Sequence, residues 1–321
     1  MTLLMKALTF IPPKTGSGRP EMQQVNLPIP EPRKGEVLVR IHFAALNNFD
    51  LETMHGQRNK AIAKALKKTA VTSGIEMAGI AESDGARIKK GDRVFGYTNI
   101  FKGPWFHAEY VALKESKLAI IPSDFTSEGA TSVIGGALTA LTALERIARL
   151  KADDKILITG ATGSVGVTAV QLAKHLGADV SAICHSSRAD YAISEGAADV
   201  YAYDRKELPE AGNQFDVVFD AAPSLSFAKA RKLLKPRGSY ITTMPHFDVP
   251  GFFRGLVSSR KWGFLMESDT DEKRMERLRT LMAQGAFRTA IDSIHLLADA
   301  KDAFARQQET GKRGKILIDF R

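Results

Sequence analysis

The spacing of apolar residues changes near Pro122, and the two parts of the chain predict different architectures. Before Pro122, alternating or β-branched runs predict short strands at residues 36–41, 90–96 (a turn that feeds a strand) and 108–113. Residues 58–68 instead have helical spacing, with apolar residues on one side and lysines on the other. We interpret this stretch as a solvated helix over a β-rich domain.

After Pro122, strand-like and helix-like segments alternate. Apolar runs predict strands at residues 155–159, 179–183, 200–203, 216–220 and 238–242. Helical spacing predicts helices at residues 123–150, 164–176, 188–194 and 226–234. This alternation indicates a parallel sheet with helices on both faces. The tail predicts helices at 271–284 and 298–308 and a last strand at 315–320, which could pair with the first domain.

The composition is typical of a globular protein with two domains. The chain has 321 residues, of which 44% are hydrophobic and 25% charged, enough for two cores. Its single cysteine, Cys184, excludes an intrachain disulfide and a multi-cysteine zinc site, and is typical of a reducing compartment. No apolar run reaches a membrane-spanning length of about 18 residues, so we expect a cytoplasmic protein. The net charge of +9 is spread along the chain, so we do not expect nucleic-acid binding.

The strongest local chemistry lies in a glycine-rich turn between the strand at 155–159 and the helix at 164–176. Three glycines spaced three apart leave room for a pyrophosphate, and the N–H groups at a helix start attract that anion. Because the turn lies inside a βαβ unit, we favour a dinucleotide site over the alternative, a tight turn without a ligand. The predicted cofactor-binding residues of the turn are Gly160, Thr162, Gly163, Ser164, Val165 and Gly166.

The residues after the next strand bear on the choice of nucleotide. An NAD site usually has an Asp or Glu about 20 residues after the glycines, which binds the ribose 2′-hydroxyl. Here the chain has Ser186, Ser187 and Arg188, and no carboxylate in this segment before Asp190. Two hydroxyls and a guanidinium suit a 2′-phosphate, so the segment predicts NADP(H). The alternative is that Arg188 is a solvated residue at a helix start.

These blocks together carry a resemblance that extends over nearly the whole chain. The order GEVLVRI, ALNNFD, GIEMAG, GDRVFG, FHAEYVAL, GATGSVG and GKILIDF resembles the medium-chain dehydrogenase/reductase superfamily, and within it the zinc-free quinone oxidoreductase (zeta-crystallin-like) branch. The resemblance implies an α/β protein with a GroES-like β-rich catalytic domain, residues 1–121 and 269–321. A Rossmann domain with a doubly wound parallel sheet would occupy residues 122–268. Family habit implies a homodimer through the Rossmann sheet edge.

Individual site residues follow from the same resemblance. Asn47 matches an asparagine beside the nicotinamide, and Thr139 a threonine beside the diphosphate and nicotinamide ribose. Ser186 and Arg188 match a serine and a basic residue around the 2′-phosphate, and Tyr203 a tyrosine that reaches the same phosphate. Each has an ordinary alternative: Asn47 as a turn residue, Thr139 as a hydroxyl at a helix start, and Tyr203 as an aromatic at a strand end.

The same blocks argue against a metal ion. Zinc members of the superfamily have a cysteine in the segment that matches 44–50 and a histidine in the block that matches 74–79. Here the first segment has no cysteine, and Ile75 precedes Glu76 in the second. We therefore expect no bound metal.

The resulting expectation is a zinc-independent enzyme that transfers hydride from NADPH to a quinone. The closest alternative is an NADPH-dependent 2-alkenal or enone reductase that uses the same site. A further alternative is a non-enzymatic NADPH-binding sensor or RNA-binding protein. Asn47 would polarise the substrate or the carboxamide, and Tyr97, directly after GDRVFG, is the best candidate for a hydroxyl that lines the substrate cleft.

Overall fold

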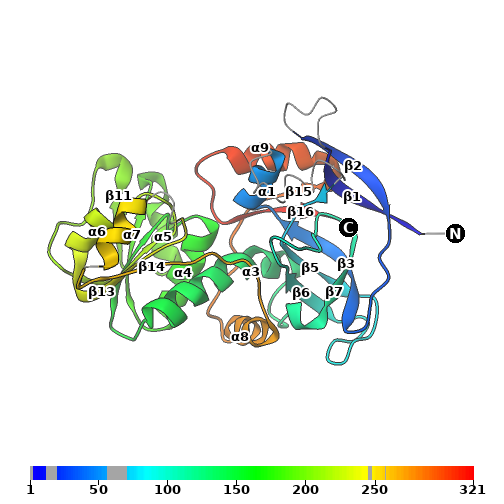
Figure 1. Cartoon of the computed structure of the whole chain (residues 1–321), viewed down its shortest axis with the longest axis horizontal. Coiled ribbons are helices and arrows are strands. Elements are labelled where there is room, and N and C mark those ends of the chain that lie inside the picture. The colour runs from blue at the N-terminus through cyan, green and yellow to red at the C-terminus, as the bar shows by residue number, and fades with distance from the viewer. Residues whose placement is uncertain (1–2, 12–19, 56–70, 245–247, 257) are drawn as a thin grey trace. The chain divides into compact units, whose positions relative to one another are not determined.

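The computed structural model describes residues 3–11, 20–55, 71–244, 248–256 and 258–321 (Figure 1). The chain divides into two compact units. The first comprises Met1–Ile134, Ser268–Gln284 and Thr289–Arg321, and the second comprises Gly135–Glu267 and Gly285–Arg288. The helix expected at 58–68 lies outside the described residues.

A seven-stranded sheet forms the centre of the first unit, with strand order β15-β16-β3-β5-β6-β8 and β7 paired with β3. The alternation of apolar residues in β3 buries every second side chain at its start, as expected of a strand with one face on a core. The strands expected at 36–41, 90–96 and 108–113 correspond to β3, β6 and β7. The bounds are β3 Glu36–Ala45, β5 Glu76–Ala81, β6 Arg93–Tyr97, β7 Tyr110–Lys114, β8 Leu118–Ile120, β15 Ile291–Leu296 and β16 Lys315–Asp319.

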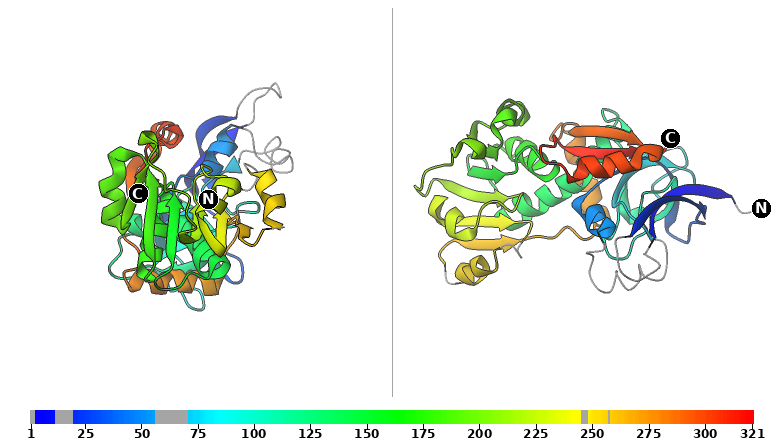
Figure 2. Two further views of the ribbon diagram at one scale, coloured as in Figure 1. Left: turned by 90° about the vertical axis from the view of Figure 1, so that its left-hand side faces the viewer. Right: turned by 90° about the horizontal axis from the view of Figure 1, so that it is seen from above.

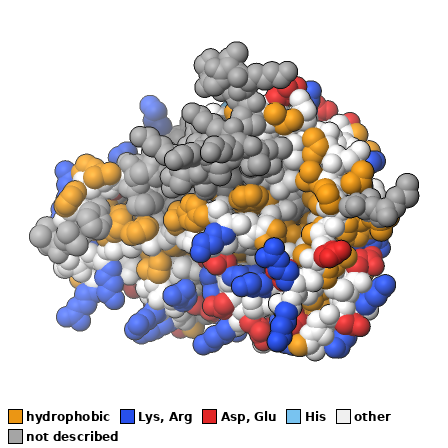
Figure 3. Space-filling view, turned by 45° about the vertical axis from the view of Figure 1, so that its right-hand side comes forward, with side chains coloured by type: hydrophobic (Ala, Val, Ile, Leu, Met, Phe, Trp, Pro, Cys, Tyr) orange, Lys and Arg blue, Asp and Glu red, His pale blue; other side chains and the backbone are white. Residues whose placement is uncertain are grey.

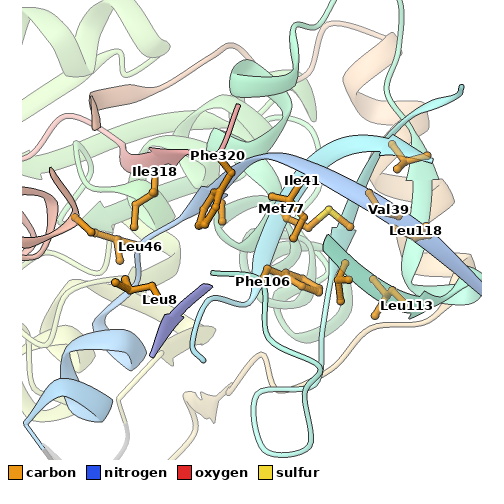
Figure 4. Packing of buried hydrophobic residues seen from close by; sticks show 14 of the residues in the cluster. Leu8, Val39, Ile41, Leu46, Met77, Phe106, Leu113, Leu118, Ile318 and Phe320 are labelled. Carbon is orange, nitrogen blue, oxygen red and sulfur yellow. The ribbon is translucent and has the colours of Figure 1, made fainter. Parts of the chain in front are cut away.

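A second, three-stranded sheet and several helices complete this unit. Its order is β2-β1-β4, from β1 Leu4–Ile11, β2 Glu21–Pro28 and β4 Val71–Thr72. The helices are α1 Asn48–Met54, α8 Glu272–Ala283 and α9 Ala300–Gln308. The core joins side chains from segments that are far apart in the chain, including Met77, Phe106 and Ile318 (Figure 4).

The second unit contains a six-stranded sheet in which every strand pair is parallel. The strand order is β11-β10-β9-β12-β13-β14, which is the doubly wound order of a Rossmann domain. Helices cover both faces of the sheet (Figure 2, left). The strands are β9 Lys155–Thr159, β10 Asp179–Cys184, β11 Asp199–Ala202, β12 Phe215–Asp220, β13 Leu234–Thr242 and β14 Lys261–Phe264. The helices are α4 Ser164–His175, α5 Ala189–Glu195, α6 Phe227–Leu233 and α7 Val249–Leu256. The expected fold class, a GroES-like domain with a Rossmann domain, is confirmed.

One feature of the tail and one of the centre add detail to the expectations. The last strand, β16, pairs with β3 through Leu317 and Ala45, so the tail does return to the first unit. The single helix expected at 123–150 is instead helix α3, Ser127–Leu141, followed by a wider π-helical segment, Thr142–Ala148.

Among the described residues, no helix is long and apolar enough to cross a membrane. A cytoplasmic location stays a prediction.

Candidate functional site

The glycine-rich turn follows β9 in the second unit and adopts a backbone that requires glycine. Gly160 has φ +60°, a conformation that L side chains rarely adopt. A Cβ on Gly166 would lie 2.1 Å from the Gly160 carbonyl oxygen, so only glycine fits there. Helix α4 begins after Gly163 with no side-chain cap. The N–H groups of its first turn therefore face no capping side chain and can receive an anion.

The turn lies where the order of strands reverses. β9 is flanked by β10 on one side and β12 on the other, and ligands of such sheets bind beside the carboxyl ends of the strands at this point. The last residues of β9 and β12 are joined, because the Thr159 hydroxyl donates to the Asp220 carboxylate at 2.6 Å. Burial raises the pKa of Asp220. Sequence reasoning missed this buried carboxylate, which holds the two strand ends together.

Helix α3 contacts the start of α4 within the same unit. A Cβ on Gly136 would lie 2.4 Å from the Ser164 carbonyl oxygen, so the two helices approach closely because this residue is glycine. Thr139 lies three residues further on, and its hydroxyl donates to the Gly135 carbonyl oxygen at 2.7 Å. Thr139 thus lies near the carboxyl end of α3, and the alternative that it is a helix-start hydroxyl is wrong.

The segments after β10 and β11 meet at the carboxyl edge of the sheet. The Ser186 backbone N–H and hydroxyl both donate to the Asp204 carboxylate, at 2.7 and 2.6 Å. His185 Nε2 lies 3.7 Å from the same carboxylate, and the His185 ring meets the Tyr203 ring edge-on at 5.8 Å between centroids. The hydrogen bonds from Ser186 hold the pKa of Asp204 below its usual range. Arg188 is half-buried and forms no ion pair within the described ranges.

This arrangement corrects one part of the sequence analysis. The absence of a carboxylate between Cys184 and Asp190 is true of the sequence, but the fold brings Asp204 to Ser186 from the neighbouring strand. Ser186, Arg188 and Tyr203 do lie in one region of the second unit, as the resemblance implied. Asp204 is the residue that sequence reasoning missed, and the parallel pairing of β10 with β11 is the signal that could have found it.

In the first unit, Asn47 precedes helix α1 and takes part in a buried polar cluster. The Lys315 ammonium donates to Asn47 Oδ1 at 2.5 Å and to Glu76 Oε1 at 2.8 Å. The side chains of Lys315 and Glu76 are only 4% and 1% exposed. Because an ammonium can only donate, the Asn47 atom that it contacts must be the oxygen. The amide nitrogen is thereby held on the other side, where it is buried and has no hydrogen-bond partner among the described residues.

The other candidate metal donors near Asn47 are engaged in hydrogen bonds. The buried Asp50 carboxylate accepts from the backbone N–H groups of Asn47 and Gly74, both at 2.8 Å. His107 is fully buried, with Nδ1 2.8 Å from the Ser73 hydroxyl and Nε2 3.3 Å from the Ala45 carbonyl oxygen. Burial lowers the pKa of His107. Within the described part of the chain, no group of three His, Cys, Asp or Glu residues is placed to hold a metal ion.

Tyr97 differs from the other predicted site residues in its burial. It ends β6, and its side chain is 1% exposed. Its place beside the substrate and its role in proton delivery both stay predictions. Asn47 and Tyr97 belong to the first unit, while the glycine turn, Thr139, Ser186, Arg188 and Tyr203 belong to the second.

Comparison with known proteins gives consistent results for both units. Residues 33–144 match the family described as alcohol dehydrogenase GroES-like domain, and residues 195–318 match the family described as zinc-binding dehydrogenase. A chloroplast envelope quinone oxidoreductase homolog from Arabidopsis thaliana is 27% identical over 330 residues, with 98% of each chain covered. An NADPH-dependent alkenal/one oxidoreductase from the same plant is 27% identical over 309 residues, which covers 91% of this chain and 74% of the relative. The solved quinone oxidoreductase from Coxiella burnetii has the same fold, with a TM-score of 0.85 over 99% of this chain and 100% of the other, at 24% identity.

Proposed function

The chain is an oxidoreductase of the medium-chain dehydrogenase/reductase superfamily, in its quinone oxidoreductase branch, and on this premise we propose that it transfers hydride from NADPH to a small hydrophobic quinone. The observation that carries the proposal is the Asn47 amide nitrogen, which is buried and unpartnered among the described residues. Leaving such a donor without an acceptor costs about 1–3 kcal/mol. A site that keeps this donor available is suited to an incoming oxygen atom.

The role of each residue follows from that donor. Bound NADPH supplies the hydride from its dihydronicotinamide ring. Asn47 Nδ2 donates to the acceptor oxygen that becomes negative, or to the carboxamide that orients the ring, and Lys315 keeps the amide in the donating orientation. Solvent supplies the proton, with the Tyr97 hydroxyl as the candidate within the protein. The glycine turn and Thr139 hold the diphosphate end.

NADPH is proposed as the nucleotide because a cation is available for the 2′-phosphate. Arg188 has no acidic partner in the described structure, and a guanidinium binds phosphate through two parallel hydrogen bonds. One relative is named as NADPH-dependent. We expect Arg188→Ala to raise the KM for NADPH by about tenfold, the cost of one charge-assisted contact, and to leave the KM for NADH unchanged. Equal effects on both nucleotides would contradict the assignment.

We also propose that the reaction needs no metal ion. Glu76 binds Lys315, Asp50 binds two backbone N–H groups, and His107 binds Ser73 and Ala45, so these donors already have partners. Elemental analysis of active protein, combined with assays after prolonged chelation, tests this. Loss of activity on chelation and its return with zinc would contradict the proposal.

A related function uses the same site on a different acceptor. The relative named as an alkenal/one oxidoreductase supports reduction of α,β-unsaturated carbonyl compounds, whose developing enolate oxygen would also accept from Asn47. An acceptor screen decides between the two. NADPH oxidation with 1,4-benzoquinone and 9,10-phenanthrenequinone, but not with 2-alkenals or alkenones, supports the quinone reductase. The reverse result supports the enone reductase, and oxidation with neither class contradicts both.

The second unit also has a surface suited to a homodimer. β14 is an edge strand of the six-stranded sheet, and Phe264 at its end is 52% exposed. Met266, shortly after it, is 62% exposed. An unpaired strand edge with exposed apolar side chains is a template for pairing with another chain. We propose that two copies join through β14.

A further inference from the structure

The carboxylate of Asp204 lies in the region where the sequence analysis places the 2′-phosphate of the nucleotide. Ser186 follows β10 and Asp204 follows β11, and these strands pair in parallel, so both residues lie at the carboxyl edge of the sheet. The Ser186 hydroxyl is one of the groups expected to bind the phosphate. It donates to Asp204 instead, at 2.6 Å, and the Ser186 backbone N–H donates to the same carboxylate at 2.7 Å.

The charge on Asp204 acts against a second anion at these donors. The hydrogen bonds from Ser186 favour the ionised carboxylate, so Asp204 is negative at neutral pH. A phosphate monoester carries a charge of about −1.5 to −2 at pH 7. Binding it at Ser186 requires that Asp204 move away or that two anions share the site, and both cost free energy.

The ribose of NADH has no 2′-phosphate, so the charge on Asp204 does not oppose its binding. Its 2′-hydroxyl is neutral and can donate to a carboxylate, as it does to the acidic residue about 20 residues after the glycines in NAD-binding Rossmann domains. Asp204 can accept this bond while it keeps its own bonds to Ser186, because an ionised carboxylate has about four acceptor positions. The residue therefore distinguishes the two nucleotides by charge.

We propose that Asp204 is a specificity-determining residue that disfavours NADPH and favours NADH. It acts against Arg188, which favours the phosphate, so it weakens the preference for NADPH that Arg188 confers. This inference rests on the nucleotide binding assumed in the proposed function, but not on the identity of the acceptor.

The test is the ratio of the dissociation constants for NADPH and NADH, measured by calorimetry on the full chain with Asp204→Asn. This variant keeps the size of the side chain and removes its charge. We expect NADPH to bind about tenfold more tightly or better, since the variant removes the repulsion between the carboxylate and a phosphate that carries nearly two charges. NADH should bind as before or more weakly.

Two further variants separate the effect of charge at this position from other effects. Glu207→Gln removes the same charge from an exposed residue three positions away and should leave the ratio unchanged. Asp204→Glu keeps the charge and should leave the ratio near that of the natural protein. Thermal unfolding of each variant establishes that it is folded.

The outcomes are distinct for the two proposals. An unchanged or decreased preference for NADPH in Asp204→Asn, with quinone reduction intact, overturns this inference alone. The expected shift in a protein that reduces no quinone or enone supports this inference and overturns the proposed function. Failure of the natural protein to bind either nucleotide overturns both.

Discussion

At the scale of single residues, the first unit contains buried polar side chains that form ion pairs or hydrogen bonds with one another and with the backbone. Lys315 and Glu76 form an ion pair that is almost inaccessible to solvent, and Asp50 accepts from two backbone N–H groups. Buried charges are usually paired, and buried polar groups of any kind are usually hydrogen-bonded. Among the described residues, the Asn47 Nδ2 atom has no such bond, and it is the atom to which we assign a role in the reaction.

Removing the cation from this cluster should be costly. In Lys315→Met, the Glu76 carboxylate stays buried without its ion pair, and we expect the free energy of unfolding to fall by about 3–5 kcal/mol. Denaturant unfolding measures this. The double variant Lys315→Met/Glu76→Met should recover most of the loss, because neither charge of the pair is then left buried without the other. The exposed control, Lys301→Met, should change stability by less than about 0.5 kcal/mol. A single variant as stable as the natural protein would contradict this account of the pair.

His107 should make stability depend on pH. Burial lowers its pKa in the folded protein below the ordinary value of 6.5. Below pH 6.5 His107 binds a proton in the unfolded chain but not in the folded protein. Protonation therefore favours the unfolded state. Stability should therefore fall as the pH falls below that value, by up to about 1.4 kcal/mol per pH unit from this residue.

The contribution of His107 is isolated by comparing variants. His107→Gln should show a shallower loss of unfolding free energy between neutral and mildly acidic pH than the natural protein. His175→Gln, which removes an exposed histidine from the end of α4, should keep the natural slope. Parallel curves for the natural protein and His107→Gln would refute the assignment. His42, whose pKa is also lowered by burial, contributes equally to all three curves.

At the scale of elements, periodicity predicted most of the second unit and less of the first. The apolar runs at 155–159 and 216–220 are buried on both faces in β9 and β12, which leaves a continuous signal in the sequence. β2 and β15 are only partly buried, so their residues carry no such signal, and neither strand was predicted. β14 and α7 were also not predicted as elements.

The same contrast applies to the candidate site. The glycine turn was predictable because its spacing and its position between a strand and a helix are local. Lys315 and Asp204 were not, since each reaches its partner from a distant part of the chain: Lys315 lies 268 residues from Asn47, and Asp204 lies 18 residues from Ser186. Pairings of this kind depend on strand order, which the spacing of apolar residues does not specify.

The strand–turn–helix unit around β9 and α4 should be sensitive to one methyl group. In Gly166→Ala, the added Cβ would meet the Gly160 carbonyl oxygen at 2.1 Å, a backbone atom that cannot move alone. We expect a loss of about 1–3 kcal/mol in stability and a weaker affinity for NADPH. Gly163→Ala places its Cβ at 3.4 Å from the same oxygen and has a negative φ, so its thermal unfolding should be nearly unchanged. Equal stability of the two variants would contradict the geometry described for the turn.

At the scale of the whole molecule, the charge distribution bears on the remaining alternative, an RNA-binding protein. On the face seen in Figure 3, acidic side chains lie among the basic ones. A nucleic-acid site usually concentrates basic residues in a patch or stripe. The net charge of +9 therefore gives this alternative little support on that face.

The proposed dimer is tested at this scale by its mass in solution. We expect the natural protein to sediment as a dimer, and Phe264→Lys to sediment as a monomer at concentrations of about 10 μM, because a lysine at a strand edge opposes pairing. Ile193→Lys, a similar change at an exposed residue on α5, should remain a dimer. If both lysine variants keep the mass of the natural protein, the interface is not at β14.

Strand β16 also has a consequence for synthesis on the ribosome. β3 emerges early, but its neighbour β16, which carries the cation for Glu76, is translated much later. A nascent chain must therefore keep an incomplete sheet protected from aggregation while the parallel sheet of the second unit is made. We therefore expect the strands of the second unit, the last of which ends at Phe264, to pair before the sheet of the first unit is complete.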